Sequence, residues 1–487
     1  MATTASANPI SAITAAGNDD EDPDLISLLP DCILTTILSL LPLPAAGRTQ
    51  ILSHRWRRLW SSAPLHLLDS HLPVPASSLS AAVSRILASH RGSAVRFHLL
   101  TARPSASDLD SWIRSLAAKN LHELVLRPPS DEALRLPPSF LSFRSLRTAE
   151  LTNCRLPEEG TGSGEVNFPH LSELTLRLAS VPSAAALHRL LVGCPGLASL
   201  SLDRVFGCRT LRVRSRSLRS LTVSVSLTRR RVQEGGGAEL EHLVVEDAPA
   251  LERLLAHDIN WGPSINVVRA PRLQMLGYMG IGIPELQLGS ALFRSMCAVQ
   301  LAAELRSVRT LALEMPEPQL KPVVDFLRCF PCLETLYVTV ILVILPKMGF
   351  IVHTLLKLVL MNFAIVVLQS HMVAPQIMKI LNHEMDDDRI ECLGHHLKEV
   401  VLKGYRGRKH EMQLATFLVR HARVLQVLKF LCENECSTNW LTKQKRQLQV
   451  DSRASLGAQF VFEKFSKSYI RFLKAASNIS LVDPFDT

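Results

Sequence analysis

The pattern L-x-x-L-x-L constrains this chain most, because it recurs through the middle of the sequence at similar intervals. Clear copies are LHELVL at 121, LSELTL at 171, LASLSL at 197, LRSLTV at 218, LEHLVV at 240, VRTLAL at 308 and LETLYV at 333. Looser copies are LRTAEL at 146, LQMLGY at 273 and LKEVVL at 397. The first six copies begin at 121, 146, 171, 197, 218 and 240, so the steps between them are 25, 25, 26, 21 and 22 residues.

Each copy predicts a short strand, because apolar and polar residues alternate and three aliphatic side chains would face the core. A period of about 20–29 residues is typical of leucine-rich repeats, in which neighbouring turns complete one another's core. Four prolines, at 169, 195, 271 and 331, stand two residues before a copy, where they would end the preceding segment. The pattern therefore predicts an irregular leucine-rich-repeat solenoid over residues 71–390.

Ahead of the repeats, the sequence DLISLLPDCILTTILSLLPLP has a helical period. Its apolar residues recur at steps of three and four and form one stripe: Ile33, Leu34, Ile37, Leu38 and Leu41. Pro30 suits the first turn of a helix, and Pro42 and Pro44 would end it. The following PAAGRTQILS can form a second short helix.

A third helix is predicted around LSHRWRRLW at 52–60. On a helix, its apolar residues share one face, whereas Arg55, Arg57 and Arg58 point elsewhere. Taken alone, the segment favours tryptophans in the core and solvated arginines. Three helices in so few residues nevertheless make a small core, so an apolar stripe of this kind should also meet a partner.

These residues resemble the F-box of plant proteins over about residues 24–70. The resemblance implies a helical module that docks on the Skp-type adaptor of a cullin-RING ubiquitin ligase. The adaptor-binding positions that it implies are Leu29, Pro30, Ile33, Ile37, Leu38, Leu41, Pro42, Leu52, Trp56, Leu59 and Trp60. His54 departs from the pattern, since a second basic residue is common there.

The C-terminal part, residues 391–487, resembles the FBD region that follows the repeats in many plant F-box proteins. The match is carried by LGHHLKEVVLKGYRG, by the helical segment after it and by the closing DPFD. The pattern is a strand, a glycine turn, an amphipathic helix and another strand. We expect an α/β cap on the open end of the solenoid core.

Arginine is dense from 204 to 231, where nine arginines occur with no acidic residue among them. A candidate patch for an acidic ligand comprises Arg212, Arg214, Arg216, Arg229, Arg230 and Arg231. Arg212 and Arg214 alternate with apolar residues in a segment between the main strands, which favours a solvated face over a binding site. The net charge of +10 is spread over 54 basic and 44 acidic residues and decides little.

Ten cysteines stand without regular spacing, which is typical of reduced thiols in the cytoplasm or nucleus. Cys329 and Cys332 form a C-x-x-C, but without a second pair they favour structural cysteines over zinc or redox chemistry. No nucleophile–base signature is evident. We predict no catalytic residue, metal or cofactor.

Two segments depart from the rest. Residues 1–23 are small, polar and then acidic, which predicts a disordered tail. Residues 341–383 form long aliphatic runs without the repeat phase, and the copies at 333 and 397 stand 64 residues apart. We predict an atypical insertion there. Membrane insertion is disfavoured because Lys357 lies at the centre of the most apolar window, 348–368.

Together these features predict an α/β chain: a three-helix F-box, a leucine-rich-repeat solenoid and an FBD-type α/β cap. The function that they favour is a substrate-recruiting adaptor of an SCF-type ubiquitin ligase, not an enzyme. Its partners would be the Skp-type adaptor and a protein target of unknown identity. The alternative is a basic repeat protein that binds nucleic acid or acidic ligands without a ligase role.

Overall fold

The structure is a computed structural model that describes residues 26, 28–129, 132–158, 166–224, 239–257, 263–280, 282–301, 305–340, 390–433, 437–464 and 483–485. Three predictions lie outside these residues: the acidic tail 1–23, the insertion 341–383 and the arginines at 229, 230 and 231. Within the described part, no helix is long and apolar enough to cross a membrane.

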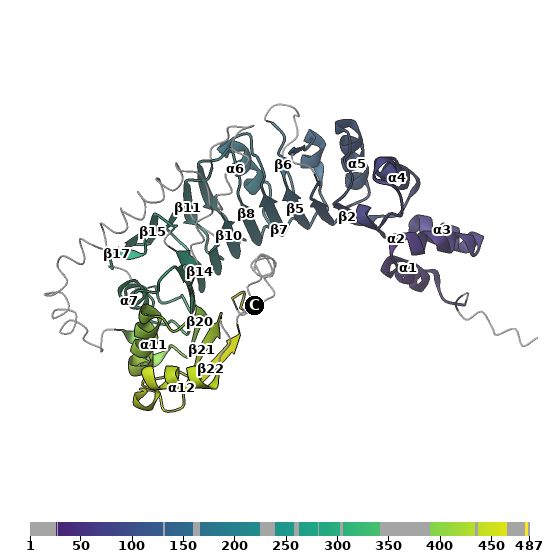
Figure 1. Ribbon diagram of the computed structural model, residues 1–487. Helices are drawn as coiled ribbons and strands as arrows, with labels where there is room; N and C mark the ends of the chain where they lie inside the picture. The colour runs from purple at the N-terminus through teal and green to yellow at the C-terminus, as the bar shows by residue number, and fades with distance from the viewer. Residues whose placement is uncertain are drawn as a thin grey trace, which may run out of the picture.

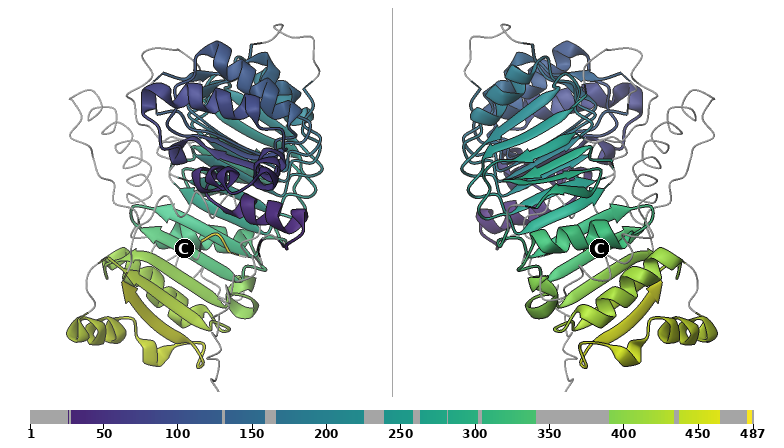
Figure 2. Two further views of the ribbon diagram at one scale, coloured as in Figure 1. Left: turned by 90° about the vertical axis from the view of Figure 1, so that its right-hand side faces the viewer. Right: turned by 90° about the vertical axis from the view of Figure 1, so that its left-hand side faces the viewer.

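Fourteen parallel strands form one curved sheet that runs through the molecule from end to end (Figure 1). In spatial order they are β1 (Leu65–Leu68), β2 (Ala94–Leu99), β3 (Glu123–Leu126), β5 (Thr148–Thr152), β7 (Glu173–Arg177), β8 (Ser199–Asp203), β10 (Ser220–Ser224), β12 (Arg253–His257), β14 (Met275–Gly280), β18 (Thr310–Met315), β19 (Thr335–Val340), β20 (Glu399–Tyr405), β21 (Val427–Cys432) and β22 (Gln459–Lys464). The side views show these strands stacked from the F-box end to the C-terminal end (Figure 2).

The repeat leucines build the core of this solenoid. In the copy at 171, Leu171, Leu174 and Leu176 are buried, and the equivalent residues of the other copies join the same continuous core, except at the copy beginning at 273, where Met279 replaces Tyr278. The apolar side chains of each turn pack against those of the turn before it, which confirms the predicted α/β repeat fold.

The copy at 240 differs from the prediction. It forms β11 (His242–Asp247), which lies in a second sheet of six strands and not in the large sheet. The other strands of the second sheet are β9 (Thr210–Arg214), β13 (Ser264–Val267), β15 (Glu285–Leu288), β16 (Ala291–Arg294) and β17 (Cys297–Gln300). The large-sheet strand of this turn is β12, whose LERLLA at 251 has the same pattern. Leu243 and Val245 of β11 enter the core from the opposite side, so alternation alone cannot separate the two sheets.

Helices and the second sheet share the convex side of the arc (Figure 1). The longer helices there are α4 (Ala76–Ser89), α5 (Ala106–Ala118), α6 (Ala184–Val192), α7 (Leu320–Cys329) and α11 (Lys409–His421). Shorter elements are η2 (Asp69–His71), η3 (Pro138–Ser142), α10 (Glu391–His395), α12 (Thr438–Gln447), η6 (Val450–Ser452) and the strand pair β4 (Leu134–Arg135) and β6 (Cys154–Arg155). The six-stranded sheet takes the place of helices in the middle of the arc.

The FBD-type region continues the large sheet. Thr335 of β19 pairs directly with Glu399 of β20 although 64 residues separate them in sequence. Gly404 has a φ of +75°, and a β-carbon there would lie 2.7 Å from the Val340 carbonyl oxygen. Only glycine fits this strand end without strain.

The N-terminal helices are α1 (Asp31–Leu40), α2 (Leu43–Arg48) with the 3₁₀ turn η1 (Thr49–Ile51), and α3 (His54–Ser62). The loop after α4 fastens the end of α3 to the solenoid. The amides of Arg91 and Gly92 both donate to the Ser61 carbonyl at 2.9 Å, and a β-carbon on Gly92 would lie 2.3 Å from the Ala63 carbonyl oxygen. The F-box is therefore held closely against the first turn of the sheet.

Asp69 fixes this first turn, and its removal should destabilise the turn. The buried carboxylate accepts three backbone N–H bonds, from Leu100, Thr101 and Ala102, at 2.6–2.8 Å. Asp69→Ala leaves these donors without their acceptor, and we expect the free energy of unfolding to fall by about 3 kcal/mol. Hydrogen exchange of residues 97–103 should accelerate. The control Glu285→Ala, which loses only an exposed ion pair with Arg294, should cost under about 1 kcal/mol. Unchanged exchange in Asp69→Ala would contradict this role.

Thiol labelling should separate buried from exposed cysteines. Burial raises the pKa of Cys154, Cys194, Cys329 and Cys392 to about 12, which lowers their thiolate fraction at pH 8 by about a thousandfold. Cys32 on α1 is exposed. We expect iodoacetamide to modify Cys32 in the native chain before these four buried cysteines, as measured by peptide mass spectrometry. Rapid modification of Cys329 would indicate a reactive C-x-x-C instead.

Candidate functional site

The inner side of the N-terminal helices forms a small core of its own. Leu34 and Leu38 of α1 pack there against Trp56 and Leu59 of α3, and all four are buried. The prediction that Leu38, Trp56 and Leu59 contact the adaptor is therefore corrected, because these side chains are used inside the module. They determine the shape of the surface and do not form it.

The outer side carries the other predicted positions. Pro30, Ile33, Ile37, Leu41, Pro42 and Leu52 are exposed, and Leu29 and Trp60 are half-buried. The analysis of the sequence missed three apolar residues that are more exposed still: Leu28 at 75%, Leu40 at 80% and Ile51 at 83%. Leu40 stands seven residues after Ile33, so helical phase could have found it. We name Ile33, Ile37 and Leu40 the α1 stripe.

The sequence predicted that Leu52 and Trp56 share a helix face, but in the structure they do not. Helix α3 begins at His54, and the Ser53 hydroxyl accepts from the Trp56 amide at 3.3 Å as an N-cap. The cap separates Leu52 from the helix, because a capping residue has extended backbone angles. Leu52 therefore remains exposed at the end of η1, while Trp56 turns inward.

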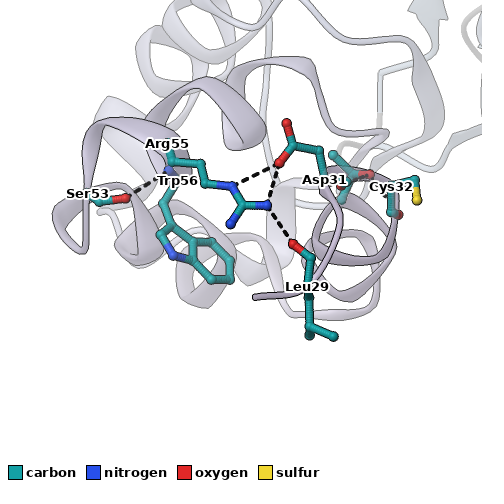
Figure 3. Close-up of polar contacts among 7 residues, drawn as sticks. Leu29, Asp31, Cys32, Ser53, Arg55 and Trp56 are labelled. Carbon is teal, nitrogen blue, oxygen red and sulfur yellow. Dashed lines mark hydrogen bonds and ion pairs between the residues drawn. The ribbon is translucent and has the colours of Figure 1, made fainter. Parts of the chain in front are cut away.

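Arg55 also differs from the prediction of a solvated arginine. Its Nη2 donates to Asp31 Oδ1 at 2.7 Å and to the Leu29 carbonyl oxygen at 2.5 Å (Figure 3). Asp31 stands in the first turn of α1, where a carboxylate also complements the helix dipole. This contact joins α3 to the start of α1 and fixes the direction from which Leu29 and Pro30 enter the helix. Arg57 and Arg58 are exposed, as predicted.

The arginine patch lies on the second sheet, and its charge is partly neutralised there. Arg212 and Arg214 both stand on β9, and both form ion pairs with Glu246 of the neighbouring strand β11, at 2.8 and 3.2 Å. Together they lower the pKa of the Glu246 carboxyl, with the Arg212 hydrogen bond as the largest cause. Arg216 is exposed. A shallow depression of about 320 Å³ lies beside Arg212.

Other arginines of the dense run also meet carboxylates from neighbouring turns. Arg219 pairs with Glu252 at 2.9 Å, and Arg209 pairs with Glu241 at 3.7 Å. The run contains no acidic residue in sequence, but the repeat places acidic residues next to it in space. The structure therefore offers no concentrated cationic surface among the described members of the patch.

The described residues contain no group of three or more His, Cys, Asp or Glu side chains placed to hold a metal ion. Cys329 ends α7 inside the core, and Cys332 is half-buried beyond it. Their surroundings are those of packing residues at a repeat boundary.

Three family models match the chain in order. The F-box domain model matches residues 26–68, the model described as "FBD-associated F-box protein At5g56370, LRR repeats" matches 109–338, and the FBD model matches 386–430. These ranges coincide with the N-terminal helices, the central turns of the solenoid and the start of the C-terminal region.

Curated relatives extend the likeness over most of the chain. F-box/FBD/LRR-repeat protein At3g52680 of Arabidopsis thaliana is 25% identical over 92% of this chain and 94% of its own length. F-box/FBD/LRR-repeat protein At4g00160 of the same plant is also 25% identical, over 92% and 95%. F-box/FBD/LRR-repeat protein At1g13570 is 30% identical over 38% of this chain and 45% of its own length. The chain therefore carries F-box, leucine-rich-repeat and FBD domains in that order, and F-box/FBD/LRR-repeat proteins of Arabidopsis are homologous to it across most of its length.

Proposed function

We propose that this protein is a substrate-recruiting adaptor of an SCF-type cullin-RING ubiquitin ligase. Its F-box would bind the Skp-type adaptor, and its solenoid would present a target protein for ubiquitin transfer by the rest of the complex. The observation that carries the proposal is the α1 stripe, an exposed apolar face on a module that matches the F-box model. Catalysis would belong to other subunits, and the protein would act in the cytoplasm or nucleus.

The docking energy would come from the exposed aliphatic side chains of the N-terminal module. Interfaces concentrate their binding energy in a few apolar anchors that become fully desolvated in the complex. Ile33 and Ile37 are 46% and 37% exposed, so each retains apolar surface that a partner can cover. Apolar side chains gathered on one helix face are typical of a docking surface.

The contact between F-box and solenoid supports a scaffolding role. His90 is buried at the junction, where its Nε2 donates to the Ala63 carbonyl oxygen at 2.8 Å and its ring packs edge-on against Trp60 at 5.4 Å. Burial lowers the pKa of His90, so the neutral ring is favoured. A stiff junction of this kind would hold a bound target at a constant distance from the ligase.

The alternative of a nucleic-acid-binding solenoid finds less support. Binding of this kind depends on basic side chains that are free to neutralise phosphates. Arg212 and Arg214 already share Glu246, and Arg219 is paired with Glu252. We therefore favour the solvated-face interpretation of the patch.

Replacing the two stripe isoleucines should abolish adaptor docking. For Ile33→Ser combined with Ile37→Ser, we expect the affinity for a purified Skp-type adaptor to fall at least thirtyfold, which is about 2 kcal/mol. Binding can be measured by biolayer interferometry. Both residues lie outside the module's core, so the thermal melting curve should change little.

The matched control is Val192→Ser combined with Val268→Ser, two exposed aliphatic residues of the solenoid. This variant should bind the adaptor as the unaltered chain does. If the stripe variant keeps full affinity while the chain remains folded, the assignment of the α1 stripe as the docking surface is wrong.

The arginine patch gives a second test. We expect Arg212→Gln combined with Arg214→Gln to leave retention of a 20-base-pair DNA, and its salt dependence, unchanged, because both arginines are already engaged with Glu246. Arg57→Gln combined with Arg58→Gln is the matched control on α3. The nucleic-acid alternative would gain support if the chain bound DNA and the patch variant alone reduced the salt slope by about two.

A further inference from the structure

The concave face of the solenoid carries a short segment of the chain's own C-terminal region. Asp483, Pro484 and Phe485 lie on the inner side of the arc, where Figure 1 shows them as a short yellow trace beside the sheet. Phe485 has an exposed fraction of 0%. The side chain of Phe485 is therefore enclosed on the concave surface that the strands form.

The Phe485 ring occupies an apolar pocket made by consecutive turns of the large sheet. Its walls come from strands β12 to β20 and comprise Leu255, Tyr278, Ala312, Tyr337 and Val401. The ring lies 5.2 Å from Tyr278, edge to face, and 5.3 Å from Tyr337 between centroids. These residues form a cluster separate from the main core, so the pocket is a feature of the concave surface.

Gly277 provides the floor of this pocket. A β-carbon at this position would lie 2.4 Å from the Cζ atom of the Phe485 ring, which no side chain can tolerate. Gly277 pairs with Leu255 of β12, which does carry a side chain. The missing side chain on β14 is what leaves room for an aromatic ring.

A bulge in β14 brings Tyr278 to the same pocket. Leu276 pairs with Leu311, but the next pair joins Met279 to Leu313, so β14 holds one residue more than β18 over this interval. The sixth position of the LQMLGY copy should face the core, yet Met279 takes that place and Tyr278 turns to the concave face. Tyr278 adopts a φ of +51°, which is strained for a bulky residue. Bulges commonly re-aim a side chain beside a binding site.

Polar side chains of the sheet form hydrogen bonds with the backbone and the carboxylate of the segment. The Tyr337 hydroxyl donates to Asp483 Oδ2 at 3.0 Å, and the buried Lys403 ammonium donates to the Phe485 carbonyl oxygen. Asp483 Oδ1 accepts from the Phe485 amide at 2.8 Å, which sets the turn of the segment. Burial lowers the pKa of Arg253, and the Asp483 carboxylate counteracts part of this effect.

Arg253 and Lys403 are both buried cations, so an acidic and hydrogen-bonding segment suits their surroundings. Here they stand beside an aromatic slot that only a flat ring fills. The combination selects an acidic residue two positions before a phenylalanine in a turned segment. The chain's own segment supplies both the ring and the carboxylate.

We propose that this pocket is the target-recognition site, and that Asp483–Phe485 occupies it as an internal ligand. A target protein with an acidic residue two positions before a phenylalanine displaces the segment. That the displacing protein is a ubiquitination target rests on the proposed function, whereas binding of the motif does not. Because the internal segment is tethered, its effective concentration is on the order of millimolar, so it excludes weak competitors.

The test uses a fluorescein-labelled peptide of residues 481–487, LVDPFDT, and fluorescence anisotropy on the full chain. Phe485→Ala empties the pocket, and we expect it to bind the peptide at least ten times more tightly than the unaltered chain. Asp483→Ala, which opens no cavity, should give a smaller increase. Phe430→Ala is the matched control, since it removes a buried ring of the main core and leaves the pocket occupied.

Two further variants place the binding in the pocket. Gly277→Val added to Phe485→Ala should abolish peptide binding, because the new side chain fills the slot. Tyr337→Phe added to Phe485→Ala should weaken the LVDPFDT peptide severalfold, but should not affect a peptide that carries Asp483→Ala. This selective loss identifies recognition of the carboxylate.

Equal peptide binding by Phe485→Ala and the unaltered chain would overturn the proposal and make the segment a structural strap only. Binding that survives Gly277→Val would overturn it as well, because the peptide would then occupy another surface. Adaptor affinity is measured in parallel on the same variants and should not change. If the peptide test fails while the chain binds the adaptor, only this inference is refuted. If the unaltered chain does not bind the adaptor, the proposed function is refuted.

Discussion

The rest of the structure depends on the parallel register of the large sheet. Across strands β18 to β22, each residue of the following series pairs with the next: Thr310, Thr335, Glu399, Val427 and Gln459. Because side chains alternate along a strand, a shift of one residue would exchange the core face for the concave face. The repeated leucines prevent the shift, since only one register buries them. The alternate positions of each strand therefore face the concave surface. Burial of the core does not determine which residues stand at these positions.

The binding features of the molecule arise where this regularity is interrupted. Strand β14 gains one residue, so Tyr278 leaves the core side and joins the concave face, while Gly277 beside it has no side chain. In the F-box, the Ser53 cap separates Leu52 from the face that carries Trp56. In both places a local backbone feature decides which apolar residue is buried within the chain and which is offered to a partner.

Charge in this fold is balanced between turns and not along the sequence. Arg212 and Arg214 share Glu246 across two strands of the second sheet, and Glu334 lies between Arg309 and Lys398 of the turns on either side. Side chains one repeat apart in sequence stand about one strand spacing apart in space. A run of basic residues can therefore face carboxylates of neighbouring turns, and for Arg212 and Arg214 this is the physical reason why we favour a solvated face over a binding site.

The sequence by itself determined the order of the parts, the repeat and the identity of the F-box helices, because apolar period and proline placement are local properties. It also identified Ile33 and Ile37 correctly as apolar residues on a helix. Only the tertiary structure decided that Leu38, Trp56 and Leu59 are core residues, since the packing of α1 on α3 selects one of two adjacent stripes. The same holds for the copy at 240, because two sheets enclose one core and both show alternation. The contact of Phe485 with Tyr278 joins residues more than 200 positions apart, and no local pattern encodes such a distance.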